Sequence, residues 1–283
     1  MIRLIATDLD GTLLNAQHMM DPTILHNMDQ VLKTGCVICF ATGRDTKSTL
    51  DIGNRPIYRI CMNGAVIVDP DGQIIYQKAI QSSIIEELMA TFPQVNFEYV
   101  GLHAKYSLYS KERKRKELEN NSFWNGEVHP SVLKMLEAQY VFDSTQEDIL
   151  SQPIYKINSW PLEKTGKQVD RWIRNHSESI VNTPFMPDCF EITHKQVNKG
   201  NAVRVLCQLL GIKESETAVY GDGLNDLSML EAFEHSYAPI DGMDQAKKKA
   251  NTIIGDSRQY SVSRHMIQIT NKKQKSSNTR DSL

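Results

Sequence analysis

The chain has few cysteines, no long apolar run and no excess of charge of one sign. Its five cysteines among 283 residues are an odd and small number, which predicts a reducing, cytoplasmic compartment rather than a disulfide framework. No apolar run reaches about eighteen residues, so no transmembrane helix is expected, and Asp8 and Asp10 interrupt the first apolar run too early for a signal peptide. A formal net charge of −2 gives no indication of a nucleic-acid or membrane partner.

Two of the cysteines, Cys36 and Cys39, form a C-x-x-C pattern inside a strand-like apolar run. In a strand, residues three positions apart point to opposite faces, which does not suit a redox pair or a shared zinc ion. We therefore expect buried structural thiols at these positions.

Strand-like apolar runs alternate with helical patterns in the first eighty residues and again in the last third of the chain. This alternation predicts an α/β fold with a Rossmann-like parallel sheet covered by helices. The early elements are expected as strands over 2–8, 37–43 and 58–69 and helices over 22–35 and 45–53. The late elements are expected as helices over 198–211, 225–233 and 245–251 and strands over 217–223 and 235–239.

The middle of the chain differs in texture, with short strands and helices in an α+β mixture. We expect a second domain over 81–187, inserted into a core that comprises 1–80 and 188–271. Within it, the charged run 111–120 is expected to be a solvated helix face or a loop. The polar tail 272–283 has little apolar content and no period, so it is expected to be disordered.

Acidic side chains follow the ends of two strands that are expected in the core. Asp8 and Asp10 follow the first strand, while Asp222 and Asp226 follow a strand near residue 220. Ligands of open parallel sheets bind at the carboxyl ends of the strands, so these carboxylates are expected to converge there. Crowded carboxylates either raise one another's pKa or demand a cation, and ligands that are all oxygen favour Mg²⁺, which leaves coordination positions for phosphate.

Other groups near the predicted strand ends suit a phosphate ligand. Lys199 lies at the start of a predicted helix, where an ammonium group can offset repulsion between a phosphate and a carboxylate. Thr42, followed by Gly43, and the backbone N–H groups after Asp8, beginning with Leu9, can donate to phosphoryl oxygens.

Each of these signals has an ordinary structural explanation when it is taken alone. A single D-x-D often terminates a strand, a lone lysine usually lies on the surface, and Thr42-Gly43 can be a simple turn. The run that begins at Asp222 also suggests a calcium loop, but its twelfth position is Phe233 and not the glutamate of an EF-hand. The functional interpretation depends on finding all four signals in this order.

Together these residues resemble the haloacid dehalogenase superfamily, and in particular its Cof-type phosphatase branch. The D-x-D-x-T motif of that superfamily is matched by Asp8 to Thr12, the Ser/Thr motif by Thr42, and the lysine motif by Lys199. The acidic G-D-x-x-x-D motif is matched from Gly221 to Asp226. The resemblance covers about 1–80 and 188–255, and it makes the inserted α+β domain a cap.

The resemblance implies specific roles for the matched residues. Asp8 would be the nucleophile that forms an aspartyl-phosphate, and Asp10 would be the acid and base that protonates the leaving oxygen and then activates water. Asp222 would be a metal ligand together with the Asp8 carboxylate and the Asp10 backbone carbonyl. The remaining implied roles are phosphate binding by Thr42, Gly43, Leu9, Lys199 and Asn225, substrate contact by Asn63, and orientation of water or Lys199 by Asp226.

Two stretches of the chain depart from the branch. Pro239 and Asp241 replace the usual Met and Asn of the stretch after the fourth motif, and Ser261 stands where a Gly is common. Neither departure touches the four motifs, but both concern the rim of the site.

Three functions remain open from the sequence. The first is a Mg²⁺-dependent phosphatase of small phosphorylated metabolites, with sugar phosphates as the default and a phosphorylated cofactor as the next choice. The second is a phosphomutase of the same superfamily, and the third is a non-catalytic phosphate-binding module; a response regulator is disfavoured by the chain length. A monomer or homodimer is expected. The cap residues that could reach a substrate are His103, Lys105, Tyr106, Trp124 and His129, and His194, after a strand of the core and near Lys199, is a further candidate contact.

Overall fold

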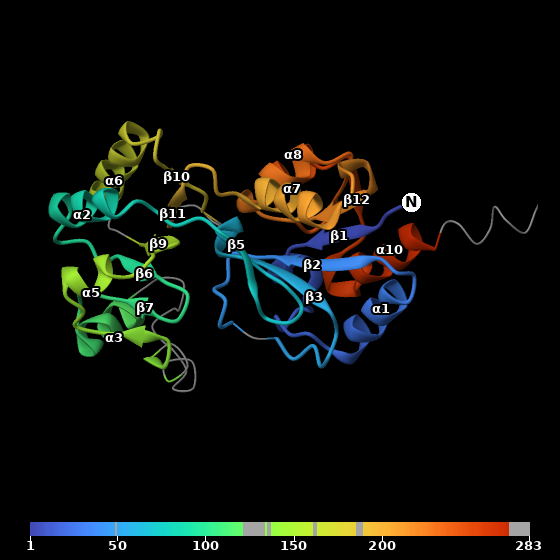
Figure 1. The fold of residues 1–283 in the computed structure, drawn as a ribbon, viewed down its shortest axis with the longest axis horizontal. Helices are drawn as coiled ribbons and strands as arrows, with labels where there is room; N and C mark the ends of the chain where they lie inside the picture. Colours follow the sequence, from blue (N-terminus) through green and yellow to red (C-terminus); the bar gives the residue numbers. More distant parts are fainter. Residues whose placement is uncertain (49, 121–133, 135–136, 161–162, 185–188, 272–283) are drawn as a thin grey trace, which may run out of the picture. The chain divides into compact units, whose positions relative to one another are not determined.

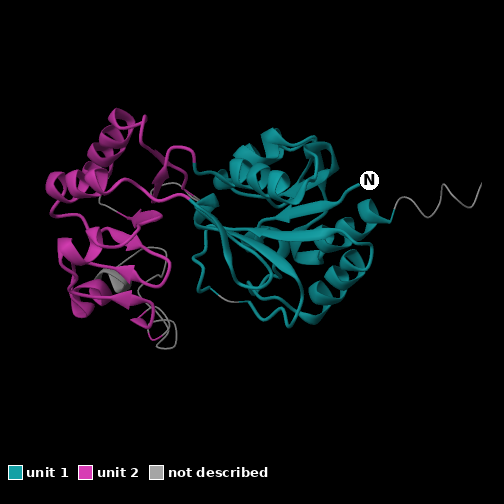
Figure 2. Ribbon diagram, viewed as in Figure 1, with its two compact units in different colours: residues 1–77, 197–283 teal, residues 78–196 magenta. Residues whose placement is uncertain are grey.

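The chain folds into two compact units that are each described separately. The computed structural model describes residues 1–48, 50–120, 134, 137–160, 163–184 and 189–271. Unit 1 comprises Met1–Gln77 and Val197–Leu283, and unit 2 comprises Lys78–Gln196, so the second unit is inserted into the first (Figure 2). No helix within the described ranges is long and apolar enough to cross a membrane.

Unit 1 contains a sheet of eight strands among the residues that the structure describes, in the order β14-β13-β12-β1-β2-β3-β4-β5 (Figure 1). The strands from β14 to β3 are parallel, whereas β4 and β5 form an antiparallel extension. The strands are β1 (Leu4–Thr7), β2 (Val37–Ala41), β3 (Ile57–Cys61), β4 (Val66–Val68), β5 (Ile74–Gln77), β12 (Thr217–Tyr220), β13 (His235–Pro239) and β14 (Thr252–Ile254).

Helices cover both faces of this sheet, as the predicted α/β class requires. Strand side chains alternate between faces, so Ile5 of β1 packs in the cluster with residues of α1 and α10, while Leu4 and Ala6 pack with residues of α7 and α8. The helices of unit 1 are α1 (Pro22–Leu32), α7 (Lys199–Leu210), α8 (Leu227–Ala232), α9 (Asp244–Lys249) and α10 (Ser261–Thr270). The prediction of a Rossmann-like parallel sheet is confirmed.

Local signals in the sequence define the helix ends that matter for the site. The Asp21 carboxylate accepts hydrogen bonds from the N–H groups of Thr23 and Ile24, and Pro22 begins α1. At α7 the Asn198 side chain accepts from the Asn201 N–H group at 2.7 Å, and Gly211 ends the helix with φ of 62°. The first residue of α7 is therefore fixed as Lys199.

Unit 2 is an α+β unit with a six-stranded sheet among its described residues, in the order β10-β11-β9-β6-β7-β8. One face packs apolar side chains such as Tyr99, Ile157 and Ile192 against helices. The strands are β6 (Glu98–Val100), β7 (Lys105–Tyr106), β8 (Tyr140–Val141), β9 (Lys156–Ser159), β10 (Ile180–Asn182) and β11 (Phe190–His194). The helices are α2 (Ser82–Thr91), α3 (Lys111–Asn120), α5 (Gln146–Leu150) and α6 (Glu163–Asn175).

The expected boundaries of the inserted domain need correction. The first boundary lies at residue 77 and not at 80, because β5 continues the core sheet to Gln77. The second boundary lies after Gln196 and not after 187, because Phe190–His194 forms β11 and pairs with β9 and β10 of unit 2. The expected tail, 272–283, lies outside the described residues.

The helix expected over 45–53 is wrong. Apart from residue 49, which is not described, this connection between β2 and β3 contains turns and no helix. The Asp45 carboxylate accepts hydrogen bonds from the N–H groups of Lys47 and Ser48, and Asp51 accepts from Gly53. Such local side-chain bonds stabilise turns in competition with a helix, and periodicity alone does not reveal them.

Candidate active site

The candidate site lies at the carboxyl ends of β1 and β12, where the order of the strands reverses. These parallel strands are neighbours, with Thr7 opposite Tyr220, and the Asp8 N–H group donates to the Tyr220 carbonyl at 2.9 Å. From this pair the chain continues to β2 and β3 on one side and to β13 and β14 on the other. The loops that leave the two strands diverge there, and doubly wound sheets bind their ligands at such a point.

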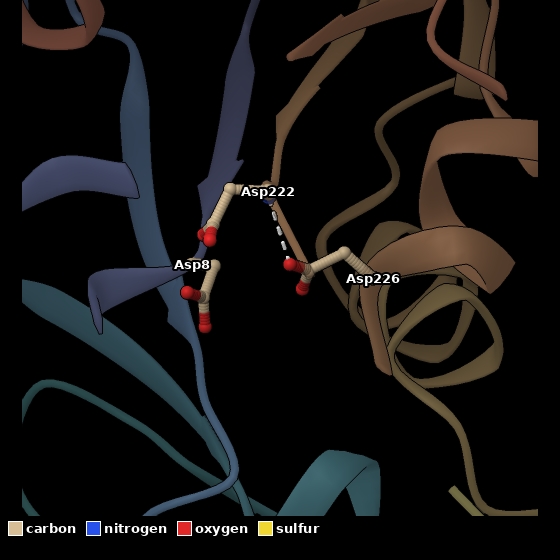
Figure 3. A group of neighbouring side chains, drawn as sticks. All are labelled: Asp8, Asp222 and Asp226. Atoms are coloured by element: carbon tan, nitrogen blue, oxygen red, sulfur yellow. Dashed lines mark hydrogen bonds between the residues drawn. The ribbon is translucent and has the colours of Figure 1, made fainter. Parts of the chain in front are cut away.

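Three carboxylates meet at these strand ends. One ligand oxygen each from Asp8, Asp222 and Asp226 lies within 4.8 Å of the others (Figure 3). The turn after β12 returns Asp226 to the cluster, because its Oδ2 atom accepts from the N–H groups of Asp222 and Gly223, both at 2.9 Å. The predicted convergence of Asp8, Asp222 and Asp226 from distant parts of the chain therefore occurs in the structure.

Lys199 inserts its ammonium group between two of these carboxylates. Its Nζ atom donates to Asp8 Oδ1 and to Asp226 Oδ1, at 2.6 Å in each case, and its side chain is fully buried. Close packing of α7 on α8 brings the lysine this deep: a Cβ atom at Gly200 would lie 2.4 Å from the Ser228 carbonyl oxygen. Burial lowers the pKa of Lys199, but the charges of Asp226 and Asp8 outweigh burial and raise it overall.

The charges in this cluster do not balance without a further cation. The cluster holds one ammonium group and three carboxylates. Burial and the charges of Asp226 and Asp222 outweigh the charge of Lys199 and raise the pKa of Asp8 well above its ordinary value. Burial and the charge of Asp226 likewise raise the pKa of Asp222 to about 6. A group of oxygen ligands that resists ionisation in this way suits a hard divalent cation such as Mg²⁺. The residues that could hold it are Asp8, Asp222 and Asp226.

A tight turn after Asp8 completes the wall beside Asp222. Gly11 adopts a φ of 82°, and a Cβ atom there would lie 2.4 Å from Asp222 Oδ2, so the turn requires glycine for its conformation and for its space. Thr12 is fully buried and donates from Oγ1 to Asp222 Oδ1 at 2.5 Å. Thr12 belongs to the D-x-D-x-T motif, but its position in the motif does not predict this contact.

Asp10 lies in a different environment from Asp8. Its carboxylate does not belong to the three-carboxylate cluster and is 42% exposed. Arg44 donates to it from Nε at 2.8 Å and from Nη2 at 2.6 Å, and His18 Nδ1 lies 3.1 Å from Oδ1. Burial raises the pKa of Asp10, but the hydrogen bonds and charge of Arg44 outweigh burial and lower it overall. The Asp10 side chain is therefore not placed as a metal ligand, which leaves only its backbone carbonyl for that predicted role.

The residues expected to hold phosphate lie at the adjoining strand ends. Thr42 follows β2 and is buried, and its Oγ1 atom accepts from the Arg44 N–H group at 3.1 Å. Asn63 is buried with a φ of 59°, donates its N–H to the Thr42 carbonyl, and accepts from Asn225 Nδ2 at 3.1 Å. The Leu9 side chain packs in the core, so at Leu9 only the backbone can face a ligand. Gly43 has no side chain, so it too can contact a ligand only through its backbone.

The remaining candidates divide between the two units. Lys105 donates to Gln139 Oε1, Tyr106 packs against the core of unit 2, and His194 lies on β11 of that unit and not in unit 1 with Lys199. Trp124 and His129 lie outside the described residues. Cys36 and Cys39 are buried free thiols, as expected.

The departures from the branch pattern stabilise neighbouring loops. Asp241 accepts hydrogen bonds from the Ser257 N–H and hydroxyl groups at 2.8 and 2.7 Å, and Ser261 donates to the Gly255 carbonyl. A Cβ atom at Gly242 would lie 3.1 Å from Asp222, so this ordered loop forms part of the wall beside the acidic cluster.

Comparison with known proteins gives relatives that span nearly the whole chain. Phosphatase YwpJ of Bacillus subtilis is 29% identical over 94% of this chain and 99% of its own length. An HMP-PP phosphatase of Serratia proteamaculans is 24% identical over 94% of each chain. Among solved structures, a haloacid dehalogenase-like hydrolase from B. subtilis has a TM-score of 0.79 at 26% identity and covers 94% of this chain and 99% of its own.

A second solved structure, a sugar phosphatase of subclass IIB of the superfamily, has a TM-score of 0.73 at 21% identity, over 94% of this chain and 98% of its own. That likeness bears on the fold. The relatives named for an activity are phosphatases, which confirms the predicted class of enzyme. The family profile described as haloacid dehalogenase-like hydrolase matches residues 5–266. The chain therefore belongs to the haloacid dehalogenase-like hydrolase family.

Proposed function

We propose that this chain is a Mg²⁺-dependent phosphatase that hydrolyses small phosphorylated metabolites through a phosphoryl group transferred to Asp8. The observation that supports the proposal most is the cluster of Asp8, Asp222 and Asp226 around the buried ammonium group of Lys199. A module that only binds phosphate does not need a carboxylate beside an ammonium group at the place where the phosphate binds. A nucleophile has that need, because repulsion between carboxylate and phosphate must be offset.

The steps follow from the positions of these side chains. In the first, an Asp8 carboxylate oxygen attacks phosphorus, the bond from phosphorus to the leaving oxygen breaks, and Asp10 gives that oxygen a proton. In the second, Asp10 takes a proton from a water molecule whose oxygen attacks phosphorus, and the bond from Asp8 to phosphorus breaks. Lys199 offsets the charge of the phosphoryl oxygens in both steps, and Thr42 and the backbone N–H of Leu9 donate to them.

The metal would be held by Asp8, Asp222 and the Asp10 backbone carbonyl, with Asp226 orienting Lys199 by the contact of 2.6 Å. When bound, Mg²⁺ supplies positive charge that favours the ionised form of these carboxylates and polarises the phosphate. The three-to-one excess of carboxylates over ammonium groups supports a divalent ion at this place.

Sugar phosphates are the proposed default substrates, and phosphorylated cofactors are the next class to test. This choice comes from the family resemblance, and the names of the relatives support a phosphorylated small molecule as the substrate. The inserted α+β unit would select the leaving group, as the resemblance implies for a cap.

The experiment measures phosphate release from para-nitrophenyl phosphate, with Mg²⁺ and with EDTA, for wild type, Asp8→Asn and a control variant. Asp71→Asn is a suitable control, because Asp71 is an exposed aspartate in the turn between β4 and β5. We expect turnover that needs Mg²⁺, is lost in Asp8→Asn and is retained in Asp71→Asn. Turnover that persists in Asp8→Asn would contradict the assigned nucleophile.

Two further outcomes would replace the proposal with one of its alternatives. Phosphate binding without turnover on this substrate and a metabolite panel would indicate a binding module. Activity that requires a bisphosphorylated sugar, with the phosphoryl group returned to a sugar, would indicate a phosphomutase.

A further inference from the structure

Two side chains outside the acidic cluster form hydrogen bonds with the Asp10 carboxylate. Arg44 donates to both oxygens, with Nε to Oδ2 at 2.8 Å and Nη2 to Oδ1 at 2.6 Å, and His18 Nδ1 contacts Oδ1 at 3.1 Å. A carboxylate has no proton to donate when it is ionised, so the His18 Nδ1 atom is then the donor. The two donors fix the rotation of Asp10 about its Cβ–Cγ bond, because they approach its oxygens along different directions.

The loop that carries His18 is built to hold it in an uncommon conformation. His18 has a φ of 56°, in the left-handed region that costs free energy for residues other than glycine. Asn15 holds the loop: its Oδ1 atom accepts from the N–H groups of Gln17 and Met19 at 3.0 Å, and its carbonyl accepts from the His18 N–H at 2.9 Å. Asn15 Nδ2 also donates to Asp21 at the start of α1. Asn15 therefore anchors the loop to the start of α1 and also stabilises the turn that places His18 beside Asp10.

We propose that Arg44 and His18 are positioning residues that aim one oxygen of Asp10, Oδ2, at the reacting groups; this inference rests on the proposed function. Among the residues that the structure describes, Oδ1 accepts two hydrogen bonds, whereas Oδ2 accepts one and keeps a lone pair for another. The oxygen with the free lone pair is the one that exchanges a proton with the leaving group and then with water. Neither Arg44 nor His18 needs to touch the phosphoryl group for this role.

The chain contains a closely matched control for the arginine. In the same connection between β2 and β3, Arg55 donates from Nε and Nη2 to the two oxygens of Asp29 at 2.7 and 2.8 Å. The side chains of the two pairs are similarly exposed, at 22% and 39% for Arg55 and Asp29 and at 26% and 42% for Arg44 and Asp10. Arg44→Met and Arg55→Met therefore remove the same kind of ion pair, the first with the proposed role and the second without it.

The test compares two substrates that need Asp10 to different degrees. The p-nitrophenolate ion leaves without a proton, whereas the alkoxide of β-glycerol phosphate needs one. For Arg44→Met we expect kcat/KM to fall by about tenfold to a hundredfold on β-glycerol phosphate, as for a lost charge-assisted hydrogen-bonded pair. On para-nitrophenyl phosphate, only the attack of water on the phosphorylated enzyme depends on Asp10. We therefore expect kcat and KM to fall together for Arg44→Met, so that kcat/KM stays near the wild-type value.

Slowing of the water step should also be visible directly. In acid-quenched reactions of Arg44→Met with para-nitrophenyl phosphate, the fraction of protein that carries one phosphoryl group, measured by intact mass, should rise above the wild-type fraction. Arg44→Lys keeps the charge but cannot donate in two fixed directions. On β-glycerol phosphate, its loss of log(kcat/KM) should therefore be more than half of the loss in Arg44→Met.

His18 is tested by a pair of variants that both tolerate its backbone conformation. His18→Gly removes the side chain, and His18→Asn keeps an N–H donor near the position of Nδ1; both residues accept a positive φ. Because the His18 side chain is 68% exposed, we expect only about a threefold loss of kcat/KM on β-glycerol phosphate for His18→Gly, and recovery of most of it in His18→Asn.

The outcomes distinguish the positioning role from the proposed function itself. Equal losses on both substrates for Arg44→Met, or losses in Arg55→Met as large as those in Arg44→Met, would overturn the positioning role and leave the phosphatase assignment intact. Two results together would overturn the proposed function, and the positioning role with it. These are a wild-type enzyme that never carries the phosphoryl group and an Asp8→Asn variant that keeps wild-type turnover.

Discussion

Asp222 provides a direct test of the view that the acidic cluster costs stability in the absence of a cation. Burial and the charge of Asp226 raise the pKa of Asp222 to about 6 from an ordinary value of 3.8. At 1.36 kcal/mol per pH unit, that difference corresponds to at most about 3 kcal/mol of unfolding free energy. The variant Asp222→Asn keeps an oxygen that can accept from Thr12 but carries no charge.

The sign of the effect follows from proton binding. Between the unfolded and the folded pKa, the folded protein binds more protons at Asp222 than the unfolded chain, so this residue makes wild type less stable as pH rises through about 6. In EDTA at about pH 8, Asp222→Asn should therefore be more stable than wild type, by up to about 3 kcal/mol. At about pH 4 the two proteins should be nearly equal, because the carboxyl is then protonated in the folded wild type.

The assay is urea unfolding in EDTA across this pH range, followed by the same series with Mg²⁺. Bound cation stabilises wild type in proportion to its affinity, so Mg²⁺ should reduce or reverse the advantage of Asp222→Asn. A stability difference that does not change with pH would refute the reasoning. So would a variant that is less stable than wild type in EDTA at every pH, since the charge at Asp222 would then not be the destabilising feature.

Three further variants test the surroundings of the cluster. Lys199→Met removes the buried ammonium group from two carboxylates and should lower the unfolding free energy in EDTA by about 3–5 kcal/mol and abolish turnover, as urea unfolding and phosphate release will show. Gly11→Ala places a methyl group within 2.4 Å of Asp222 at a φ of 82° and should lower stability by about 1–3 kcal/mol and weaken Mg²⁺ binding in calorimetry. Asp21→Ala removes the N-cap of α1 and should cost about 1 kcal/mol in urea unfolding while the KM for para-nitrophenyl phosphate is retained.

The core and its acidic cluster could be predicted from the sequence because their signals are local and their convergence is dictated by topology. Asp8 and Asp222 each end an apolar strand, and parallel neighbours bring such ends together without further information. The helix expected over 45–53 failed because side-chain hydrogen bonds from Asp45 and Asp51 favour turns. The segment 190–194 joins the sheet of unit 2 and not the core, and a strand pattern does not say which of two sheets a strand will join.

The contacts around Asp10 could not be predicted, because they depend on geometry between segments. Nothing in the local sequence indicates that His18 adopts a positive φ or that Arg44, after β2, bonds to Asp10, after the neighbouring β1. A histidine eight residues after an aspartate has no fixed spatial relation to it in a loop. The hydrogen bonds of Asn15, which fold the loop back, are the missing signal.

Asp8 and Asp10 are two residues apart, yet their environments push their pKa values in opposite directions. Burial among other acids raises the pKa of Asp8, whereas hydrogen bonds and charge from Arg44 lower that of Asp10. This order is the reverse of what the first proposed step needs, since the nucleophile must be ionised and the acid must carry a proton. A divalent cation beside Asp8 and Asp222 favours ionised Asp8, and a phosphate dianion beside Asp10 raises its pKa by like charge. Metal and substrate would then set the two carboxyl groups to their working states together, which is a physical reason to expect that EDTA abolishes turnover.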